Sequence, residues 1–225
     1  MNNGFFITGT DTEVGKTYVS CALLRAFSQQ GKRVAAMKPV ASDCKIGPQG
    51  LRNDDALQLI DNSDLQLPYE IVNPYHFEPA IAPHIAAAQA NIKINLPGLK
   101  HTFQQIEKQA DLTLVEGAGG WWVPLDDDHT LADLAVALEL PVILVVGIRL
   151  GCINHSLLSA AAIRASGLTL AGWVANRIDP DCAFIDENIL AINQRIGAPC
   201  LGDLPYAPQL NANQRVEFMD VSTLL

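Results

Sequence analysis

Residues 5–17 read Phe-Phe-Ile-Thr-Gly-Thr-Asp-Thr-Glu-Val-Gly-Lys-Thr, and this stretch decides the fold class. The apolar run at 5–8 predicts a strand, and the segment from residue 16 to about 30, which begins KTYVSCALL, predicts a helix. A strand, a loop bounded by Gly9 and Gly15, then Lys-Thr and a helix form the context of a phosphate-binding loop. Such a loop turns backbone N–H groups toward a phosphate, and the helix N-terminus adds the positive end of its dipole.

The loop also carries side chains suited to a nucleotide. Lys16 is expected to reach the β and γ phosphates, and the Thr17 hydroxyl is expected to bind Mg²⁺. The spacing departs from the usual pattern, because five residues rather than four separate Gly9 and Gly15. A tight turn before a helix is the alternative interpretation, which Gly-Lys-Thr and its flanks disfavour. The loop residues expected to contact ATP are Glu13, Val14, Gly15, Lys16, Thr17 and Tyr18.

Short apolar runs alternate along the whole chain with longer segments of helical period, which is typical of βα units and a parallel sheet. The runs are apolar on both faces, as strands covered by helices on both sides must be. Six strands are expected, at Phe5–Thr8, Arg33–Lys38, Leu112–Glu116, Val142–Gly147, Leu170–Asn176 and Cys200–Gly202. Seven helices are expected, at about 16–30, 54–61, 83–90, 97–109, 130–139, 153–166 and 183–196. Residues 43–82, rich in glycine and proline, are expected to be irregular around one short helix.

Composition excludes several classes of protein. The 225 residues include 15 Lys and Arg against 24 Asp and Glu, so neither nucleic acid nor an anionic membrane is expected as a partner. With 49% hydrophobic residues, no repeat and no linker, residues 1–225 are expected to form a single P-loop domain, a mostly parallel sheet flanked by helices. The chain has no signal-like N-terminus, no apolar run of membrane-spanning length and five cysteines without a disulfide pattern. A cytoplasmic protein is therefore expected.

A second motif, DLTLVEGAGG at 111–120, is expected to serve a metal. Its apolar strand delivers Glu116 into a glycine-rich turn, as the Walker B strand of P-loop enzymes delivers its carboxylate, usually Asp. A strand that ends in a solvated Glu is the alternative. Asp54 and Asp55 offer one further metal ligand, with N-capping of the short helix the favoured role for Asp54. The turn residues expected to line the nucleotide site are Gly117, Ala118 and Gly119.

Beyond these motifs, the sequence resembles the dethiobiotin synthetase family. The likeness rests on FITGTDTEVGKT and on KPVAS at 38–42, and it continues through GLRN, NPY, VEGAGGW, LPVILVVG, LGCINH and LAGWVAN, from residue 4 to about 205. The resemblance implies ATP- and Mg²⁺-dependent closure of a ureido ring on 7,8-diaminopelargonate with CO2. The products would be dethiobiotin, ADP and phosphate. It also implies an N-carbamate and a carbamic-phosphoric mixed anhydride, so catalysis would rest mostly on positioning and electrostatics.

The resemblance assigns roles to individual residues. Lys38 matches the family's active-site lysine and, with Lys16, would supply positive charge to the reacting groups. Mg²⁺ would be held by Thr17, Asp55 and Glu116. Contacts to the diamine would come from Thr12 and Ser42 and, across a homodimer interface, from a turn of the second subunit at Gly151, Cys152, Ile153 and Asn154.

Several alternatives remain at this stage. Asn154 could instead cap its own helix. The purine would be read by Asn176, but Asn176 to Asp179 also approximates the guanine-reading NKxD motif, which leaves tolerance of other nucleotides open. The further residues expected to flank the nucleotide are Arg177, Pro205, Tyr206 and Ala207.

Three other functions are weighed against a synthetase. A ParA/MinD-type ATPase switch would carry a signature lysine five residues before the Gly-Lys-Thr lysine, where this chain has Asp11. A cobyrinic-acid-type amide synthase would need a glutaminase domain, for which 225 residues leave no room. A non-catalytic nucleotide-binding module would require Lys38 and Glu116 to be dispensable.

Overall fold

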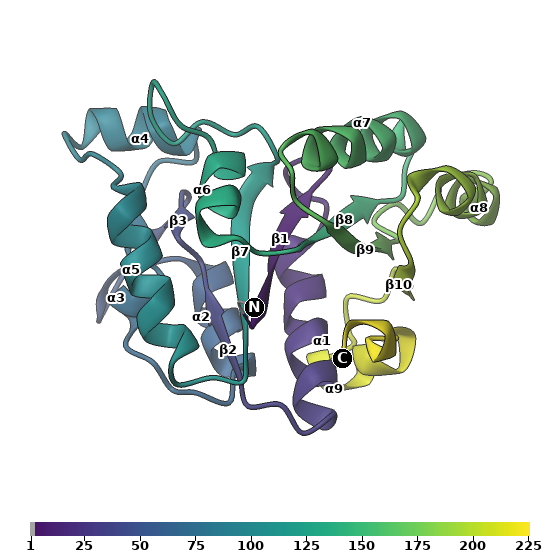
Figure 1. The fold of residues 1–225 in the computed structure, drawn as a ribbon, viewed down its shortest axis with the longest axis horizontal. Coiled ribbons are helices and arrows are strands. Elements are labelled where there is room, and N and C mark those ends of the chain that lie inside the picture. The colour runs from purple at the N-terminus through teal and green to yellow at the C-terminus, as the bar shows by residue number, and fades with distance from the viewer. Residues whose placement is uncertain (1–2) are drawn as a thin grey trace.

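A parallel sheet of six strands forms the centre of the computed structural model, which describes residues 3–225 (Figure 1). The strand order is β10-β9-β8-β1-β7-β2, and every neighbouring pair is parallel. All six expected strands are present, and the predicted fold class is confirmed. Their bounds are β1 Gly4–Gly9, β2 Val34–Met37, β7 Leu112–Gly120, β8 Val142–Gly147, β9 Leu170–Asn176 and β10 Cys200–Leu204.

The seven expected helices are also present, and each begins and ends within two residues of its predicted limits. Among residues 3–225, no helix combines the length and the apolar character needed to cross a membrane. The bounds are α1 Lys16–Gln29, α2 Asp54–Asn62, α4 Pro83–Gln89, α5 Leu96–Glu107, α6 Leu131–Leu138, α7 Cys152–Ala165 and α8 Ile185–Ile196.

The segment 43–82 is more ordered than predicted. It contains a hairpin of β4 (Lys45–Gly47) and β5 (Gly50–Arg52), and α3 (Tyr69–Val72) follows α2. A two-residue strand, β6 (Tyr75–His76), pairs in parallel with β3 (Val40–Ala41), which lies just after β2. Strands this short show no periodicity of their own, so the pattern of apolar residues could not reveal them. The chain ends in α9 (Ala212–Arg215) and two 3₁₀ turns, η1 (Val216–Phe218) and η2 (Ser222–Leu224).

Two hydrophobic layers hold the sheet between helices. On one face, Phe5 and Ile7 of β1 pack with α1 through residues such as Phe27. On the other face, Phe6 joins the core that includes Phe103 of α5 and residues of α6, α7 and α8. Figure 1 shows this division, with α7 above β8 and β9 and α1 below them. Burial of each large apolar side chain here stabilises the fold by about 1.5–3 kcal/mol. Because helices cover both faces of the sheet, both faces are apolar, as the sequence predicts.

Because all six strands run in one direction, their carboxyl ends share one edge of the sheet. At this edge β1 continues into the phosphate loop and β2 leads into Lys38. Glu116 belongs to β7, and Asn176 ends β9. In open α/β sheets this edge is where ligands bind, and here it gathers residues far apart in the sequence.

Candidate active site

The phosphate loop between β1 and α1 has a backbone that only certain residues can adopt. Gly15, which caps α1, has φ 82°, and Glu13 has φ 60°. A Cβ at Gly15 would collide with the side-chain nitrogen of Asn176. That nitrogen donates a hydrogen bond of 2.9 Å to the Val14 carbonyl, so the end of β9 pins the loop. The glycine in the motif is therefore required both by backbone angle and by a close neighbour.

Lys16 is the buried cation of this loop. Its Nζ donates to the backbone carbonyl of Asp11 at 3.2 Å, and the residue is only 7% exposed. Burial, followed by repulsion from the nearby Lys38, lowers the pKa of Lys16 to about 8. An anion bound in the loop would offset both effects, which suits a lysine that meets phosphates.

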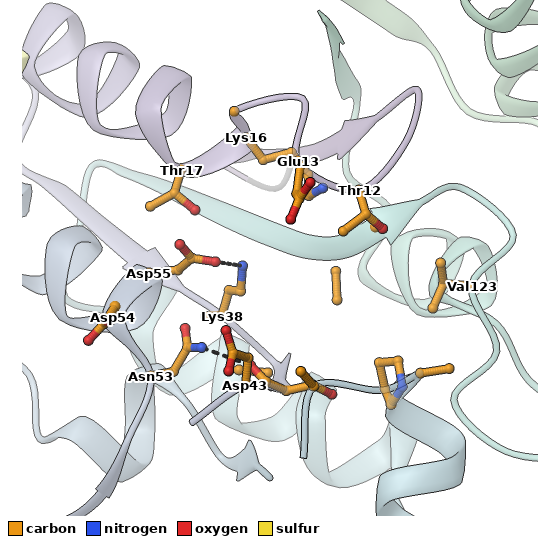
Figure 2. Close-up of a pocket in the computed structure, with 18 of the residues that line it drawn as sticks. Thr12, Glu13, Lys16, Thr17, Lys38, Asp43, Asn53, Asp54, Asp55 and Val123 are labelled. Atoms are coloured by element: carbon orange, nitrogen blue, oxygen red, sulfur yellow. Dashed lines mark hydrogen bonds and ion pairs between the residues drawn. The ribbon is translucent and has the colours of Figure 1, made fainter. Parts of the chain in front are cut away.

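A buried ion-pair cluster lies beside the loop. Thr17 Oγ1 donates to Glu116 Oε1 at 2.7 Å, and Lys38 Nζ donates to the same oxygen at 2.6 Å. Lys38 Nζ also donates to Asp55 Oδ2 at 3.0 Å (Figure 2). Glu116 is fully buried, and its second oxygen, Oε2, has no hydrogen-bond partner among the described residues.

The charges in this cluster stabilise one another. Burial by itself would lower the pKa of Lys38, but Glu116 and Asp55 hold it above its ordinary value. Burial would likewise raise the pKa of Asp55, but Lys38 holds it below its ordinary value. Near neutral pH, Lys38 is therefore charged and Asp55 is ionised.

The same residues fit a hard divalent cation. Thr17, Asp55 and Glu116 present only oxygen atoms, the donors that Mg²⁺ prefers. The free Oε2 of Glu116 is a buried acceptor that a cation could satisfy. In the structure Lys38 occupies the position between the two carboxylates.

The structure separates the two neighbouring aspartates at the start of α2. Asn53 caps the helix, since its Oδ1 accepts from the Ala56 N–H at 3.1 Å. Asp54 is exposed and pairs with Lys45 at 2.7 Å, whereas Asp55 turns toward Lys38. The predicted N-capping by Asp54 is therefore wrong, because the preceding asparagine takes that position.

A cavity of about 870 Å³ opens over the cluster (Figure 2). The buried hydroxyl of Ser42, which has no hydrogen-bond partner among the described residues, belongs to its lining. Other predicted site residues in the lining are Thr12, Glu13, Gly15, Lys16, Thr17, Tyr18, Lys38, Asp55, Ala118 and Gly119. Further lining residues come from loops without a motif and were not predicted, among them Asp43, Ala80, Ile81, Ala82 and Val123.

A second, smaller pocket of about 220 Å³ shares Gly15 and Tyr18 with the large cavity. The guanidinium of Arg177 at its edge is held by Asp203, with bonds of 2.8 and 2.6 Å, and by Asp186 at 2.8 Å. The predicted nucleotide residues that line this pocket are Asn176, Arg177, Pro205, Tyr206 and Ala207.

Some predicted residues do not line either cavity. Val14, Gly117 and Glu116 are not part of either lining. Glu116 accepts hydrogen bonds from Thr17 and Lys38, which do line the larger cavity. The segment Gly151 to Asn154 lies at the start of α7 and lines neither cavity of its own chain. Gly151 caps α7, so the alternative role of Asn154 as the cap is wrong.

The fold and this site define the class of protein, a P-loop nucleotide-binding protein. A family model described as an AAA domain matches residues 3–214. The ATP-dependent dethiobiotin synthetase BioD of Pseudomonas aeruginosa strain UCBPP-PA14 is 55% identical over 202 residues, 89% of each chain. The protein of that name from Cellvibrio japonicus is 52% identical over 221 residues, 98% of this chain and 97% of that one. The chain belongs to the dethiobiotin synthetase family, ATP-dependent ligases of biotin biosynthesis.

Solved structures share the fold at much lower sequence identity. A chain of the MinC:MinD cell division protein complex of Aquifex aeolicus matches with a TM-score of 0.59 and 17% identity, over 95% of this chain and 86% of that one. At this identity the likeness shows the P-loop fold alone.

Proposed function

We propose that this enzyme closes a ureido ring on 7,8-diaminopelargonate with CO2 and MgATP, giving dethiobiotin, ADP and phosphate. The observation that carries the proposal is the convergence of Lys16 and Lys38 on one cavity that also presents Thr12 and Ser42. A carbamate and a triphosphate bring several negative charges together, and two buried ammonium groups beside a metal site match that need.

In this mechanism one amine of the substrate takes up CO2 as a carbamate, and the γ-phosphoryl group of ATP passes to a carbamate oxygen. The second amine then attacks the carbonyl carbon, and phosphate leaves. Lys16 binds the β and γ phosphates, and Lys38 turns from Glu116 and Asp55 toward the transferred group. A bound Mg²⁺ supplies charge neutralisation of phosphate oxygens, and Thr17, Asp55 and Glu116 would hold it. No protein nucleophile takes part.

ATP spans both cavities in this proposal, with its phosphates at the loop and its base in the smaller pocket. The Asn176 side chain donates to Val14, which leaves its oxygen to accept from an exocyclic amine of the base. Arg177 shapes the pocket wall, since its guanidinium is already paired with two aspartates.

The proposed active form is a cytoplasmic homodimer of single-domain subunits. The start of α7, with Gly151, Cys152, Ile153 and Asn154, would serve the substrate of the other subunit, since it lines neither cavity of its own chain. The exposed Leu150 and Leu158 beside it suit a covered surface. All five cysteines are free, as expected for a reducing compartment.

Mass spectrometry of a reaction with purified protein tests this function. Diaminopelargonate, bicarbonate and MgATP together should yield dethiobiotin and an equal amount of ADP, and omission of any one should abolish the product. Hydrolysis of ATP at a rate independent of the diamine, without dethiobiotin, would overturn the proposal and favour a nucleotide switch.

A further inference from the structure

Lys38 lies outside the hydrogen-bond ladder of the sheet, so other groups must hold its backbone. Strand β2 ends at Met37, and Pro39, which has no N–H, follows Lys38. The Lys38 N–H donates to the Val72 carbonyl at 2.7 Å, and the Lys38 carbonyl accepts from Asn73 Nδ2 at 2.6 Å. Val72 and Asn73, at the end of α3, thus bind both the N–H and the carbonyl of Lys38.

Asn73 is fully buried, and its amide group is well satisfied. Besides the bond to Lys38, its Nδ2 donates to the Tyr75 carbonyl at 3.3 Å, and its Oδ1 accepts from the Tyr69 hydroxyl at 2.8 Å. The Tyr69 hydroxyl in turn accepts from the backbone N–H of Asn53 at 2.7 Å. One hydroxyl group therefore joins the two asparagines.

Asn53 extends this connection to two more residues of the site. Its Oδ1 caps α2, the helix that carries Asp55 in its first turn, and its Nδ2 donates to the Ser42 carbonyl at 3.1 Å. Buried hydrogen bonds of this kind fix geometry because leaving any member unpaired is costly.

We propose that Asn53, Tyr69 and Asn73 form a positioning relay that sets Lys38, Ser42 and Asp55 relative to one another for the reaction. The inference rests on the proposed function, since it concerns the same cavity. Tyr69 and Asn73 do not line that cavity, so they act through the backbone of the residues that do. The relay also accounts for the motifs GLRN and NPY, for which phosphate binding gives no reason.

The substitution Tyr69→Phe tests the relay at its centre. It removes the hydroxyl and leaves the ring, which packs against Arg52 at 4.1 Å and His76 at 5.3 Å. Tyr75→Phe is a matched control, because the Tyr75 hydroxyl also accepts from a backbone N–H, that of Asn95 at 3.1 Å, but leads to the start of α5.

We expect Tyr69→Phe to lower kcat for dethiobiotin formation by about tenfold, since small displacements of reacting groups have effects of this size. Its Kd for ATP should change by less than about twofold, because the phosphate loop and the smaller pocket do not involve the relay. Tyr75→Phe should keep both quantities within about twofold of the wild type. Asn53→Ser can still cap α2 but cannot reach the Ser42 carbonyl. It should lower kcat by more than Tyr75→Phe and by less than Tyr69→Phe.

The relay is overturned if Tyr69→Phe keeps the wild-type kcat, or if Tyr75→Phe loses as much. A parallel loss of kcat and ATP affinity in Tyr69→Phe would also overturn it, because that pattern indicates general loosening of the site. The wild-type enzyme is assayed first, so a wild type that forms no dethiobiotin identifies failure of the proposed function itself. Full turnover in Tyr69→Phe identifies failure of the relay alone.

Discussion

Asp11 of the phosphate loop and Arg149 of the β8–α7 loop form an ion pair, with 2.5 Å between Asp11 Oδ2 and Arg149 Nη2. Asp11 stands where a MinD-type switch would carry its signature lysine, and its carboxylate is committed to a cation of the same chain. The pair joins the loop to the segment that leads into α7. This charge arrangement argues against a nucleotide switch that uses a lysine at this position.

The Asp11–Arg149 pair should add little to stability. Both side chains are more than two-fifths exposed, and exposed pairs contribute about 0–1 kcal/mol. We expect Arg149→Met to lower the free energy of unfolding in urea by less than about 1 kcal/mol. Lys45→Met, which removes another exposed pair, should behave alike. A loss near that of a buried pair would contradict this assignment.

ATP affinity should fall as pH rises through the pKa of Lys16. Burial and the neighbouring Lys38 lower that pKa to about 8, so the charge that attracts phosphate is lost between about pH 7 and 9. Without ligand, the unfolded chain binds more protons above this pKa, so the contribution of Lys16 to the free energy of unfolding rises with pH there. Titration calorimetry across this range measures the affinity.

Lys16→Arg is the control for this pH effect, because the guanidinium stays charged across the whole interval. Its affinity for ATP, even if weaker, should be nearly independent of pH. An equally flat profile in the wild type would contradict the lowered pKa.

Removal of Lys38 should destabilise the ligand-free protein and open the proposed metal site. Lys38→Met leaves Glu116 buried without its cation, which we expect to cost about 3–5 kcal/mol of unfolding free energy. Mg²⁺ should then raise the thermal midpoint of the variant more than that of the wild type, since the ion takes the position of the ammonium group. The Lys45→Met variant should show no such response, and equal Mg²⁺ effects in all three proteins would exclude a metal at these carboxylates.

A methyl group at Gly15 should disturb the loop more than backbone strain alone can explain. Gly15→Ala combines φ 82° with a collision against Asn176, whereas Gly31→Ala has φ 81° and open space. We expect about 1 kcal/mol of destabilisation for Gly31→Ala and about 2–3 kcal/mol for Gly15→Ala. Only Gly15→Ala should weaken ATP binding, by about tenfold or more. Equal effects of the two variants in denaturation and calorimetry would show that the collision with Asn176 has no measurable cost.

Local patterns predicted the parts of the structure that depend on local chemistry. The strand, loop and helix around Gly15 follow from glycine and apolar spacing, and the long helices lie where the sequence predicts them. Contacts between distant segments were not predictable in this way. Asp54 and Asp55 carry the same chemistry, and only the cap by Asn53 decides which of them turns toward Lys38. Asn73 likewise meets Lys38 where the end of α3 and the β3–β6 pair lie against the end of β2, contacts that no local pattern reveals.

The central place of β1 in the sheet has a consequence for how the protein is made. This strand is synthesised before its partners β7 and β8, which are encoded about a hundred residues or more later. Until then its apolar residues, such as Phe6 and Ile7, have no sheet to join. Strands so far apart in the sequence pair slowly, and their apolar surface stays exposed to aggregation until they do. The nascent chain should therefore depend on chaperones until β7 and β8 have been made, and it should gain the ability to hold a nucleotide only after the residues that line the smaller pocket have followed.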